Sequence, residues 1–356
     1  MKINKAMKFE ELNTLLNDRM KYFNVPGISM TYFESGMIHW KKTAGVLQQN
    51  TNNKIDENSI FHACSISKMI TALSALCLVQ EGVLNLNTPV NELLTSWKIP
   101  TNKFTGIKEI TLADILAHQG GFYDAPGSFE PYKSGTPIPT LLELLKGTGE
   151  YNLEEVHPQY TPQIDFSYSD GGYCVIAQLI KDVTGESLPQ IAQKYIFTPL
   201  ALQSTFFWEV GKEPKQFPKT IIDNCAIGHN KHGNIVDELR AQYPNTEGAG
   251  LWSTPTELTT IVLDVLDSYH HKKGKILTTE MAERLLTPYG DKSFIGLGVF
   301  LDSKQGSCFS QGWGVGMQCK LKFFPKTNTG LVVMTNSDPG CEQNKSLIGE
   351  IIELIL

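Results

Sequence analysis

The chain has 356 residues, of which 41% are hydrophobic and 19% are charged. This composition is typical of a globular protein that is long enough for one large domain or for two lobes around a cleft. The formal net charge is −6 and no basic run occurs, so nucleic acid is not an expected partner. No apolar stretch reaches the roughly 18 residues that a membrane span requires.

The N-terminal segment, MKINKAMKFEELNTLL, carries positive charge but has no apolar core behind it, so it does not resemble a signal peptide. Seven cysteines are scattered along the chain, and none of them forms a C-x-x-C pair. We therefore expect free thiols in a reducing compartment and a cytoplasmic location. An exported protein from which the signal had been removed would show the same pattern.

The first half of the chain begins with a helix and a hairpin. Residues 9–23 have apolar side chains at helical spacing and predict an amphipathic helix. Residues 27–46 form two alternating runs around Glu34-Ser35-Gly36, which predicts a β-hairpin. From residue 65 to about 250 the pattern is mainly helical, with loops rich in proline and glycine between the helices.

The last hundred residues return to strands. Thr254-Pro255-Thr256-Glu257 predicts a helix that opens with a capping box and a proline in its first turn. Strand-like runs follow at 294–301, 317–324 and 330–336. The final segment, 346–356, predicts a closing helix.

This order of elements predicts how the chain is divided. Strands from both ends would pair into one antiparallel sheet that is flanked by the terminal helices. That α/β lobe would comprise about residues 1–62 and 251–356, and a large, mainly helical insertion of about residues 63–250 would form an all-α lobe. A cleft between the two lobes is the expected place for an active site.

The stretch HACSISKMITALSALCLVQEG, residues 62–82, is an apolar helix that opens with Ser65 and Lys68. Residues three apart share one face of a helix. A buried amine beside a helix N-terminus can be neutral and accept the serine proton, and the backbone N–H of Ser65 would face a developing oxyanion. Alternatively, Ser65 caps the helix and Lys68 extends to solvent. The Ser-x-x-Lys pattern alone leaves both interpretations open.

A second candidate motif is Tyr168-Ser169-Asp170, which precedes another apolar helix. A phenol that lies beside a lysine ammonium can ionise and share the role of base with it. The alternative is a tyrosine of the hydrophobic core, with Asp170 as the helix N-cap.

Ser65-Ile66-Ser67-Lys68, Tyr168-Ser169-Asp170 and a late Gly-rich strand entry together resemble the three motifs of the penicillin-recognising serine hydrolases. The similarity is to the class C β-lactamase-like branch, which includes D-alanyl-D-alanine carboxypeptidases, D-aminopeptidases and esterases. Three stretches between the motifs also resemble family segments: ITLADILAHQGGF, IFTPLALQSTFF and EGAGLWSTPTEL. The resemblance extends from about residue 10 to residue 345.

The resemblance implies a β-lactamase/transpeptidase-like fold and a role for each matching residue. Ser65 would be the acylated nucleophile, Lys68 its proton acceptor and Tyr168 the partner base. Members of the family need neither a metal nor an organic cofactor, and this sequence has no H-E-x-x-H motif. The implied substrate is a small ester, amide or peptide.

The second motif departs from the family pattern at Asp170, where relatives usually have asparagine. The asparagine amide donates a hydrogen bond to the substrate, whereas an ionised aspartate can only accept one. Asp170 would pair with Lys68 or receive a cationic or N–H-bearing group of the substrate.

The third motif, Lys-Thr-Gly or His-x-Gly in relatives, is also altered. The literal match, Lys304-Gln305-Gly306, lies between two strand-like runs and predicts a hairpin turn. A better alignment places Ser310, Gln311 and Gly312 in the motif, with the backbone N–H of Trp313 as the second oxyanion donor. A slip of one residue would exchange Ser310 for Gln311, and neither side chain is charged.

The third motif lacks the cation that the family pattern has, and the second motif has the Asp170 carboxylate in place of an amide. Both differences disfavour an anionic substrate. The sequence therefore predicts a serine hydrolase that acts on a small ester or amide and is weak on β-lactams that carry a carboxylate. Phe122, Tyr123 and Trp313 would line the cleft as aromatic substrate contacts. The alternative is a non-catalytic relative that uses the cleft to bind a ligand or a protein.

Overall fold

A six-stranded antiparallel sheet is the centre of the computed structural model, which describes residues 5–213 and 215–356, with the side chains of residues 12, 14–213 and 215–356. Its strand order is β2-β1-β9-β8-β7-β6. The strands are β1 (Gly27–Glu34), β2 (Met37–Gly45), β6 (Phe300–Asp302), β7 (Ser307–Gly314), β8 (Met317–Phe324) and β9 (Thr329–Thr335). The two ends of the chain therefore build one sheet, as predicted.

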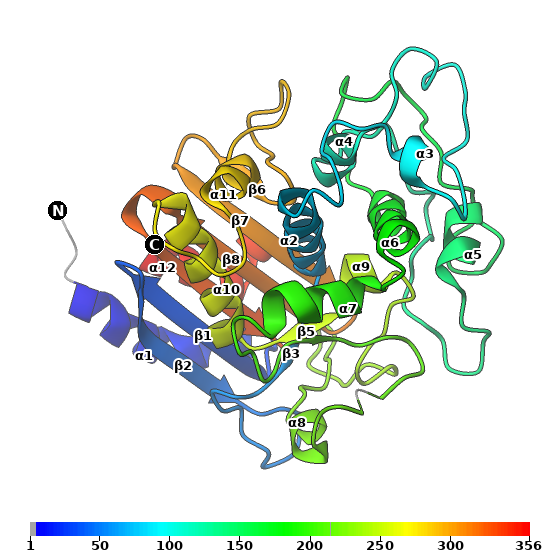
Figure 1. The fold of residues 1–356 in the computed structure, drawn as a ribbon. Coiled ribbons are helices and arrows are strands. Elements are labelled where there is room, and N and C mark those ends of the chain that lie inside the picture. The colour runs from blue at the N-terminus through cyan, green and yellow to red at the C-terminus, as the bar shows by residue number, and fades with distance from the viewer. Residues whose placement is uncertain (1–4, 214) are drawn as a thin grey trace.

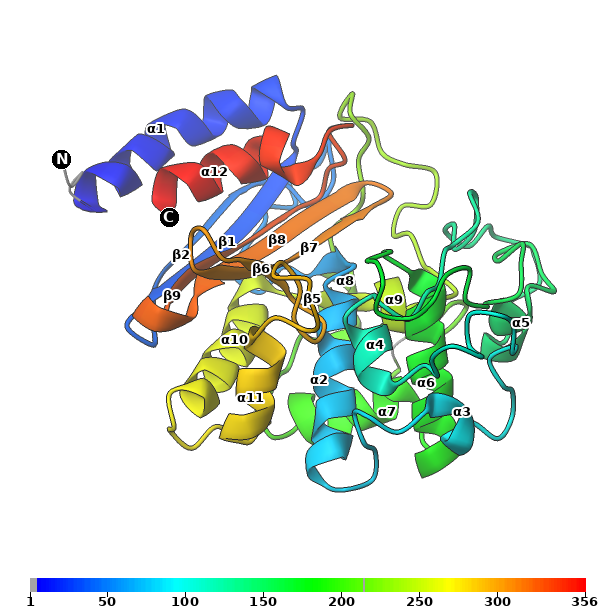
Figure 2. The ribbon, with the colours of Figure 1, turned by 90° about the horizontal axis from the view of Figure 1, so that it is seen from above.

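Two helices cover one face of this sheet, α1 (Lys5–Tyr22) and α12 (Leu347–Ile355), and they lie side by side (Figure 2). Their apolar faces and the sheet enclose a separate small core, which includes Leu16, Met30, Val333 and Ile351. Burial of such side chains is the main favourable contribution to folding.

The opposite face carries the rest of the helices (Figures 1 and 2). Next to the sheet lie α2 (Ser67–Gln80), α10 (Pro255–Tyr269) and α11 (Thr279–Leu286). Farther out are α3 (Val90–Leu93), α4 (Leu112–Leu116), α5 (Leu141–Lys146), α6 (Asp170–Thr184), α7 (Leu188–Ala192), α8 (Lys219–Asp223) and α9 (Thr246–Ala249). Short turns of helix are η1 (Gln193–Phe197), η2 (Pro325–Thr327) and η3 (Gln343–Lys345).

A second, three-stranded sheet connects the helical part to the large sheet. Its order is β3-β5-β4, from β3 (Phe61–Cys64), β5 (Leu251–Ser253) and β4 (Phe206–Phe207). The main core is continuous across the junction, because Leu73 of α2 and Leu321 of β8 belong to one cluster of buried side chains. The division into two lobes stays an interpretation of the chain order.

The N-terminal predictions agree with the structure. The helix predicted at 9–23 is α1, and the predicted hairpin is β1–β2. Its turn residues Ser35 and Gly36 have φ of 53° and 77°, and two such residues in succession are typical of a type I′ hairpin turn. Lys304-Gln305-Gly306 is the turn between β6 and β7, as predicted.

Two C-terminal predictions need correction. Of the strand predicted at 294–301, only the end lies in β6, because the chain folds back at Gly298, whose φ is +93°. Thr254 caps α10 as expected, but the Glu257 carboxylate does not complete a capping box. It accepts hydrogen bonds from the backbone N–H groups of Gln203 and Ser204 instead, and so fixes the loop before β4.

Within the described residues, no helix has the length and apolar character needed to cross a membrane. All seven cysteines are free thiols, as expected, and six of them are buried.

Candidate active site

Ser65 lies in the turn between β3 and α2. The helix begins at Ser67, two residues later than the sequence pattern suggests, but the Lys68 N–H still bonds to the Ser65 carbonyl at 3.1 Å. The Ser67 hydroxyl fixes this turn, because it donates to the Cys64 carbonyl at 2.5 Å and accepts from the Leu251 N–H at 2.9 Å. Among the described residues, the Ser65 N–H has no acceptor, so it is available to an oxyanion.

Lys68 is buried, with 3% of its surface exposed. Its Nζ donates to Ser65 Oγ at 3.3 Å, to Asp170 Oδ1 at 2.7 Å and to the Gly248 carbonyl at 3.0 Å. An ammonium has three N–H donors, and all of them are used. Burial alone would lower the pKa of Lys68, but the charges of Asp170 and Tyr168 and the hydrogen bonds to both residues together outweigh burial and raise it. Lys68 is therefore a charged ammonium, and not the neutral amine that the helix N-terminus suggested.

Tyr168 directly precedes α6, and its ring centroid lies 4.8 Å from Lys68 Nζ. The ring also stacks on His118 with the centroids 4.4 Å apart. Although 38% of Tyr168 is exposed, burial around its phenol and the Asp170 charge raise its pKa. The Lys68 charge and hydrogen bonds to Ser65 and Lys68 oppose the rise. Burial, together with the Lys68 charge, lowers the pKa of His118 well below its ordinary value, so this imidazole is neutral. The three residues predicted as catalytic thus lie together.

Asp124, which the sequence did not single out, holds the start of α6 in place. Its carboxylate accepts hydrogen bonds from the Ser169 hydroxyl at 2.8 Å, from the Gly171 N–H at 3.2 Å and from the Asp170 N–H. Burial and the neighbouring charge of Asp170 raise the pKa of Asp124 to about 6. The only signal in the sequence was an aspartate in a loop rich in glycine and proline.

A second group missed by the sequence analysis lies on α9. Asn245 Nδ2 donates to Asp170 Oδ1 at 2.7 Å. The buried atoms Asn245 Oδ1 and Glu247 Oε1 have no hydrogen-bond partner among the described residues. The second carboxylate oxygen of Asp170, Oδ2, has no donor among these residues either. Burial raises the pKa of Glu247. The side of the site behind Lys68 is therefore rich in acceptors and poor in donors.

Strand β7 forms the edge of the site. Its outer neighbour β6 pairs with it only as far as Phe309, so the residues from Ser310 onward have no strand outside them. A Cβ at Gly312 would lie 2.7 Å from Cys64 Cβ, which places this face of β7 against the residue before Ser65. Side chains alternate along a strand, so Ser310 shares the face of Gly312.

Gln311 and Trp313 lie on the opposite face of β7. Gln311 is paired with Lys320 of β8, whose ammonium bonds to Asn344 beside α12. Trp313 is 45% exposed, and its indole N–H donates to Asp338 at 2.8 Å. Ser310 thus lies on the face of β7 that is turned toward Cys64 and Gln311 on the other, and the register of the third motif stays a prediction. The oxyanion role of the Trp313 N–H stays a prediction.

Phe122 is a correction, because it is a core residue and not a substrate contact. Only 3% of it is exposed, and its ring fills the space beside Gly120 and Gly172. The adjacent Tyr123 is 55% exposed and is the aromatic residue of this loop that faces solvent.

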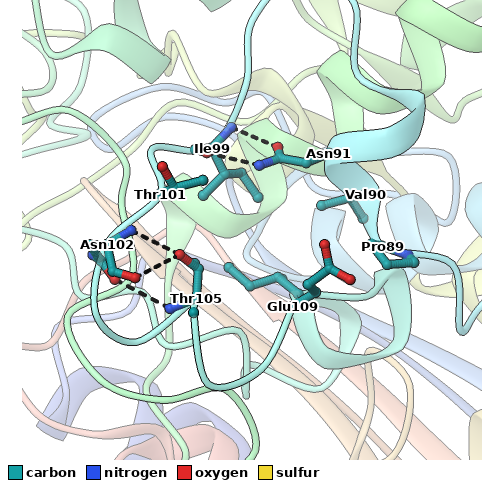
Figure 3. A pocket seen from close by; sticks show the side chains of 10 residues that line it. Pro89, Val90, Asn91, Ile99, Thr101, Asn102, Thr105 and Glu109 are labelled. Atoms are coloured by element: carbon teal, nitrogen blue, oxygen red, sulfur yellow. Dashed lines mark hydrogen bonds between the residues drawn. The ribbon is translucent and has the colours of Figure 1, made fainter.

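A cavity of about 160 Å³ in the helical part is lined by none of these residues (Figure 3). The Asn91 amide there exchanges two hydrogen bonds with the backbone of Ile99, and Asn102 closes its own loop with Thr105. These polar groups serve the local fold. Within the described residues, no cluster of three or more His, Cys, Asp or Glu side chains could hold a metal ion.

Comparison with known proteins places this geometry in context. The chain is 26% identical over 267 residues to a teichoic acid D-alanine hydrolase of Staphylococcus aureus, a match of 75% of this chain and 59% of that protein. The chain thus spans about three fifths of the length of this relative.

Solved structures share the fold. A penicillin-binding protein homologue from Pyrococcus abyssi matches with a TM-score of 0.76 at 20% identity, over 97% of this chain and 75% of that one. The D-amino acid amidase from Ochrobactrum anthropi matches with a TM-score of 0.77 at 18% identity, over 98% and 97%. The family model described as Beta-lactamase matches residues 12–353. This chain therefore belongs to the Beta-lactamase family, whose fold it shares with penicillin-binding proteins and amidases.

Proposed function

We propose that this protein is a serine hydrolase that forms an acyl-enzyme on Ser65 from a small ester or amide of a D-amino acid. The observation that carries the proposal is the 3.3 Å contact between Lys68 Nζ and Ser65 Oγ, with the Tyr168 ring 4.8 Å from the same ammonium. A nucleophile, a positive charge and a titratable phenol at these distances are the groups that acyl transfer needs.

The contacts of Lys68 favour a particular division of roles. Three acceptors hold the Lys68 ammonium, so Lys68 does not act as a neutral amine. Lys68 and Tyr168 titrate as a coupled pair, and the pair can receive the Ser65 proton once it has lost one of its own two protons. Tyr168 then carries the negative charge and accepts the proton, and Lys68 stabilises the phenolate. The pair returns the proton to the leaving group, and water repeats the sequence to release the acid. The N–H groups of Ser65 and Trp313 would bind the oxyanion.

The substrate class is inferred from charge. Asp170 pairs with Lys68, and Asp124 bonds to the Asp170 backbone N–H. Asp170 Oδ2 has no donor among the described residues. A free α-ammonium would supply the missing donors, whereas a substrate carboxylate would be repelled. The similarity to a teichoic acid D-alanine hydrolase and to a D-amino acid amidase supports the same class. We expect weak turnover of β-lactams that carry a carboxylate.

The test is covalent labelling with a fluorophosphonate, followed by intact-mass analysis. Wild type should gain one adduct, Ser65→Ala none, and Ser134→Ala, which removes an exposed loop serine, should label like wild type. Hydrolysis of D-alanine p-nitroanilide should exceed that of its L-enantiomer and its N-acetyl derivative. Equal labelling in Ser65→Ala, or no adduct on the folded protein, would overturn the hydrolase proposal in favour of a binding protein.

A further inference from the structure

Directly behind Ser65 lies a buried cluster that the proposed chemistry does not use. Cys64 Sγ is 3.5 Å from His62 Nδ1, and at most 1% of either residue is exposed. The His62 ring lies between Tyr243 and Trp252, with centroids 5.4 and 5.2 Å away, and its Nε2 bonds to the Ala249 carbonyl. The imidazole is thus held in one orientation toward the thiol.

Cys319 of β8 completes the cluster. Its Sγ donates to the Ala63 carbonyl at 3.0 Å, one residue before Cys64. A Cβ added to Gly312 would stand 2.7 Å from Cys319 Sγ and 2.7 Å from Cys64 Cβ. The two cysteines therefore pack against the same point of β7, and they can do so because residue 312 has no side chain.

The charges in the cluster favour a reactive thiol. Burial alone would raise the pKa of Cys64. Hydrogen bonding with Cys319 and His62 and the charges of His62 and Lys68 together outweigh burial and lower the pKa. Burial likewise disfavours a charged His62, and the Cys64 thiolate raises the pKa of the imidazole. A thiolate paired with an imidazolium is the reactive form of cysteine.

We propose that Cys64 and Cys319 are an oxidative modification site, and that they form a reversible intramolecular disulfide when the protein meets hydrogen peroxide. The Cys64 thiolate attacks one peroxide oxygen, an S–O bond forms, the O–O bond breaks, and the departing hydroxide takes a proton to become water. The Cys319 sulfur then attacks the Cys64 sulfenic acid, an S–S bond forms, and the S–O bond breaks. The hydroxyl leaves with the Cys319 proton as a second water. The two sulfurs lose two electrons, and the peroxide gains them.

The disulfide would alter the catalytic serine because Cys64 precedes it. Cys64 has a φ of +47°, a conformation that few non-glycine residues adopt, and the β3–β5 register shifts between His62 and Cys64. The Cys64 carbonyl also accepts the Ser67 hydroxyl bond that fixes the turn. Drawing Cys64 toward β8 would displace Ser65, and a misplacement on the order of 1 Å can cost about a hundredfold in rate.

The decisive experiment maps the bond itself. Reduced protein is treated with hydrogen peroxide, its remaining thiols are alkylated, and it is digested without reductant. We expect a peptide cross-linked between Cys64 and Cys319, absent in Cys319→Ala and in Cys319→Ser but present in Cys308→Ala, which removes another buried thiol. The folded state of each variant is checked by thermal unfolding. Absence of this peptide in oxidised wild type would overturn the proposal.

A second readout is fluorophosphonate labelling of Ser65, which rests on the proposed function. Peroxide should slow labelling of wild type and Cys308→Ala, about tenfold or more by the positional argument above, and dithiothreitol should restore it. Cys319→Ala should resist. Equal inactivation of Cys319→Ala would show that another oxidation inhibits the enzyme, and would overturn the coupling. If no variant labels at all, the hydrolase proposal fails, while the cross-linked peptide still decides the disulfide.

Discussion

The Lys68 ammonium has three acceptors, and only one of them, Asp170, carries a full negative charge. The raised pKa of Lys68, together with the raised pKa of Tyr168, means that both groups hold their protons at neutral pH. The reactive form has lost one of these protons. The apparent pKa of that loss belongs to the pair, so kcat/KM should rise with pH on the alkaline side of neutrality.

Asp170→Asn should move this alkaline limb to lower pH, since the Asp170 charge raises the pKa of both Lys68 and Tyr168. Among the other groups of the site, burial raises the pKa of Tyr173 and Glu247 and lowers that of His118. Asp124, with a pKa of about 6, titrates on the acid side of this limb. The measurement is a pH profile of kcat/KM with neutral p-nitrophenyl acetate. Asp165→Asn, at an exposed aspartate, is the control. An unchanged limb in Asp170→Asn would contradict the role given to this carboxylate.

Tyr168→Phe should lower kcat/KM by about a hundredfold or more, the usual contribution of a general acid–base group. Tyr173→Phe is the matched control, because this buried tyrosine of α6 donates to the Leu116 carbonyl at 3.1 Å and its ring lies 5.8 Å from Lys68 Nζ. It should lose about 1 kcal/mol of stability and keep its activity. Near-wild-type rates in Tyr168→Phe would leave Lys68 as the base.

At the scale of elements, the site depends on the first turn of α6. Asp124 caps that turn from a separate loop and fixes the backbone of Asp170 and the Ser169 side chain next to Tyr168. Asp124→Ala leaves these donors without an acceptor, which should cost about 2 kcal/mol in the free energy of unfolding. It should also lower kcat, because Tyr168 and Asp170 are no longer held against Lys68.

The matched control removes a cap far from the site. Thr140 caps α5 by accepting from the Glu143 N–H at 3.2 Å, so Thr140→Ala should lower the melting temperature and leave kcat/KM unchanged. Thermal unfolding and ester hydrolysis are measured on both variants. If the activity of Asp124→Ala and of Thr140→Ala falls in step with their loss of stability, the result would contradict a positioning role for Asp124.

The elements that local patterns govern were predictable from the sequence. The β1–β2 hairpin, β8, β9 and both terminal helices follow from periodicity and turn residues. Ser65 and Lys68 were predictable for the same reason, as they lie three residues apart. Glu257 was not, because its carboxylate bonds to residues more than fifty positions away, at Gln203 and Ser204. Phe122 was misjudged because aromatic type alone does not distinguish a packing residue from a surface one.

At the scale of the molecule, the site is assembled from four distant segments. Ser65 comes from the turn after β3 and Lys68 from α2. Asp124 comes from a loop, Asp170 from α6 and Gly248 from α9. Contacts across such separations depend on the tertiary fold. This is why the sequence could single out Ser65, Lys68 and Tyr168 but could not give Asp124, Asn245 or the protonation state of Lys68. The roles assigned to the predicted residues stay predictions until they are tested by mutation.

The same assembly fixes the sign of charge that the site presents. Ser310 of β7 is uncharged at the position for which the resemblance implies a cation. No arginine hydrogen-bonds to Asp170 or Asp124 among the described residues. A desolvated charge contact is worth about 1.4 to 2.8 kcal/mol, or about tenfold to a hundredfold in specificity. Neutral p-nitrophenyl esters should therefore be hydrolysed faster than penicillins, cephalosporins or D-peptides that end in a carboxylate.

Ser310→Lys combined with Asp170→Asn should reverse this preference by about tenfold or more, since it adds the missing cation and removes the like charge. Gln311→Lys with Asp170→Asn is the control, because residue 311 lies on the opposite face of β7 beside Lys320, where a cation would not meet the substrate. The measurement is the ratio of kcat/KM for a chromogenic cephalosporin to that for p-nitrophenyl acetate. If the Gln311 variant changes this ratio and the Ser310 variant does not, the register of the third motif is wrong by one residue. A wild-type protein that hydrolyses both substrates equally fast would refute the charge argument itself.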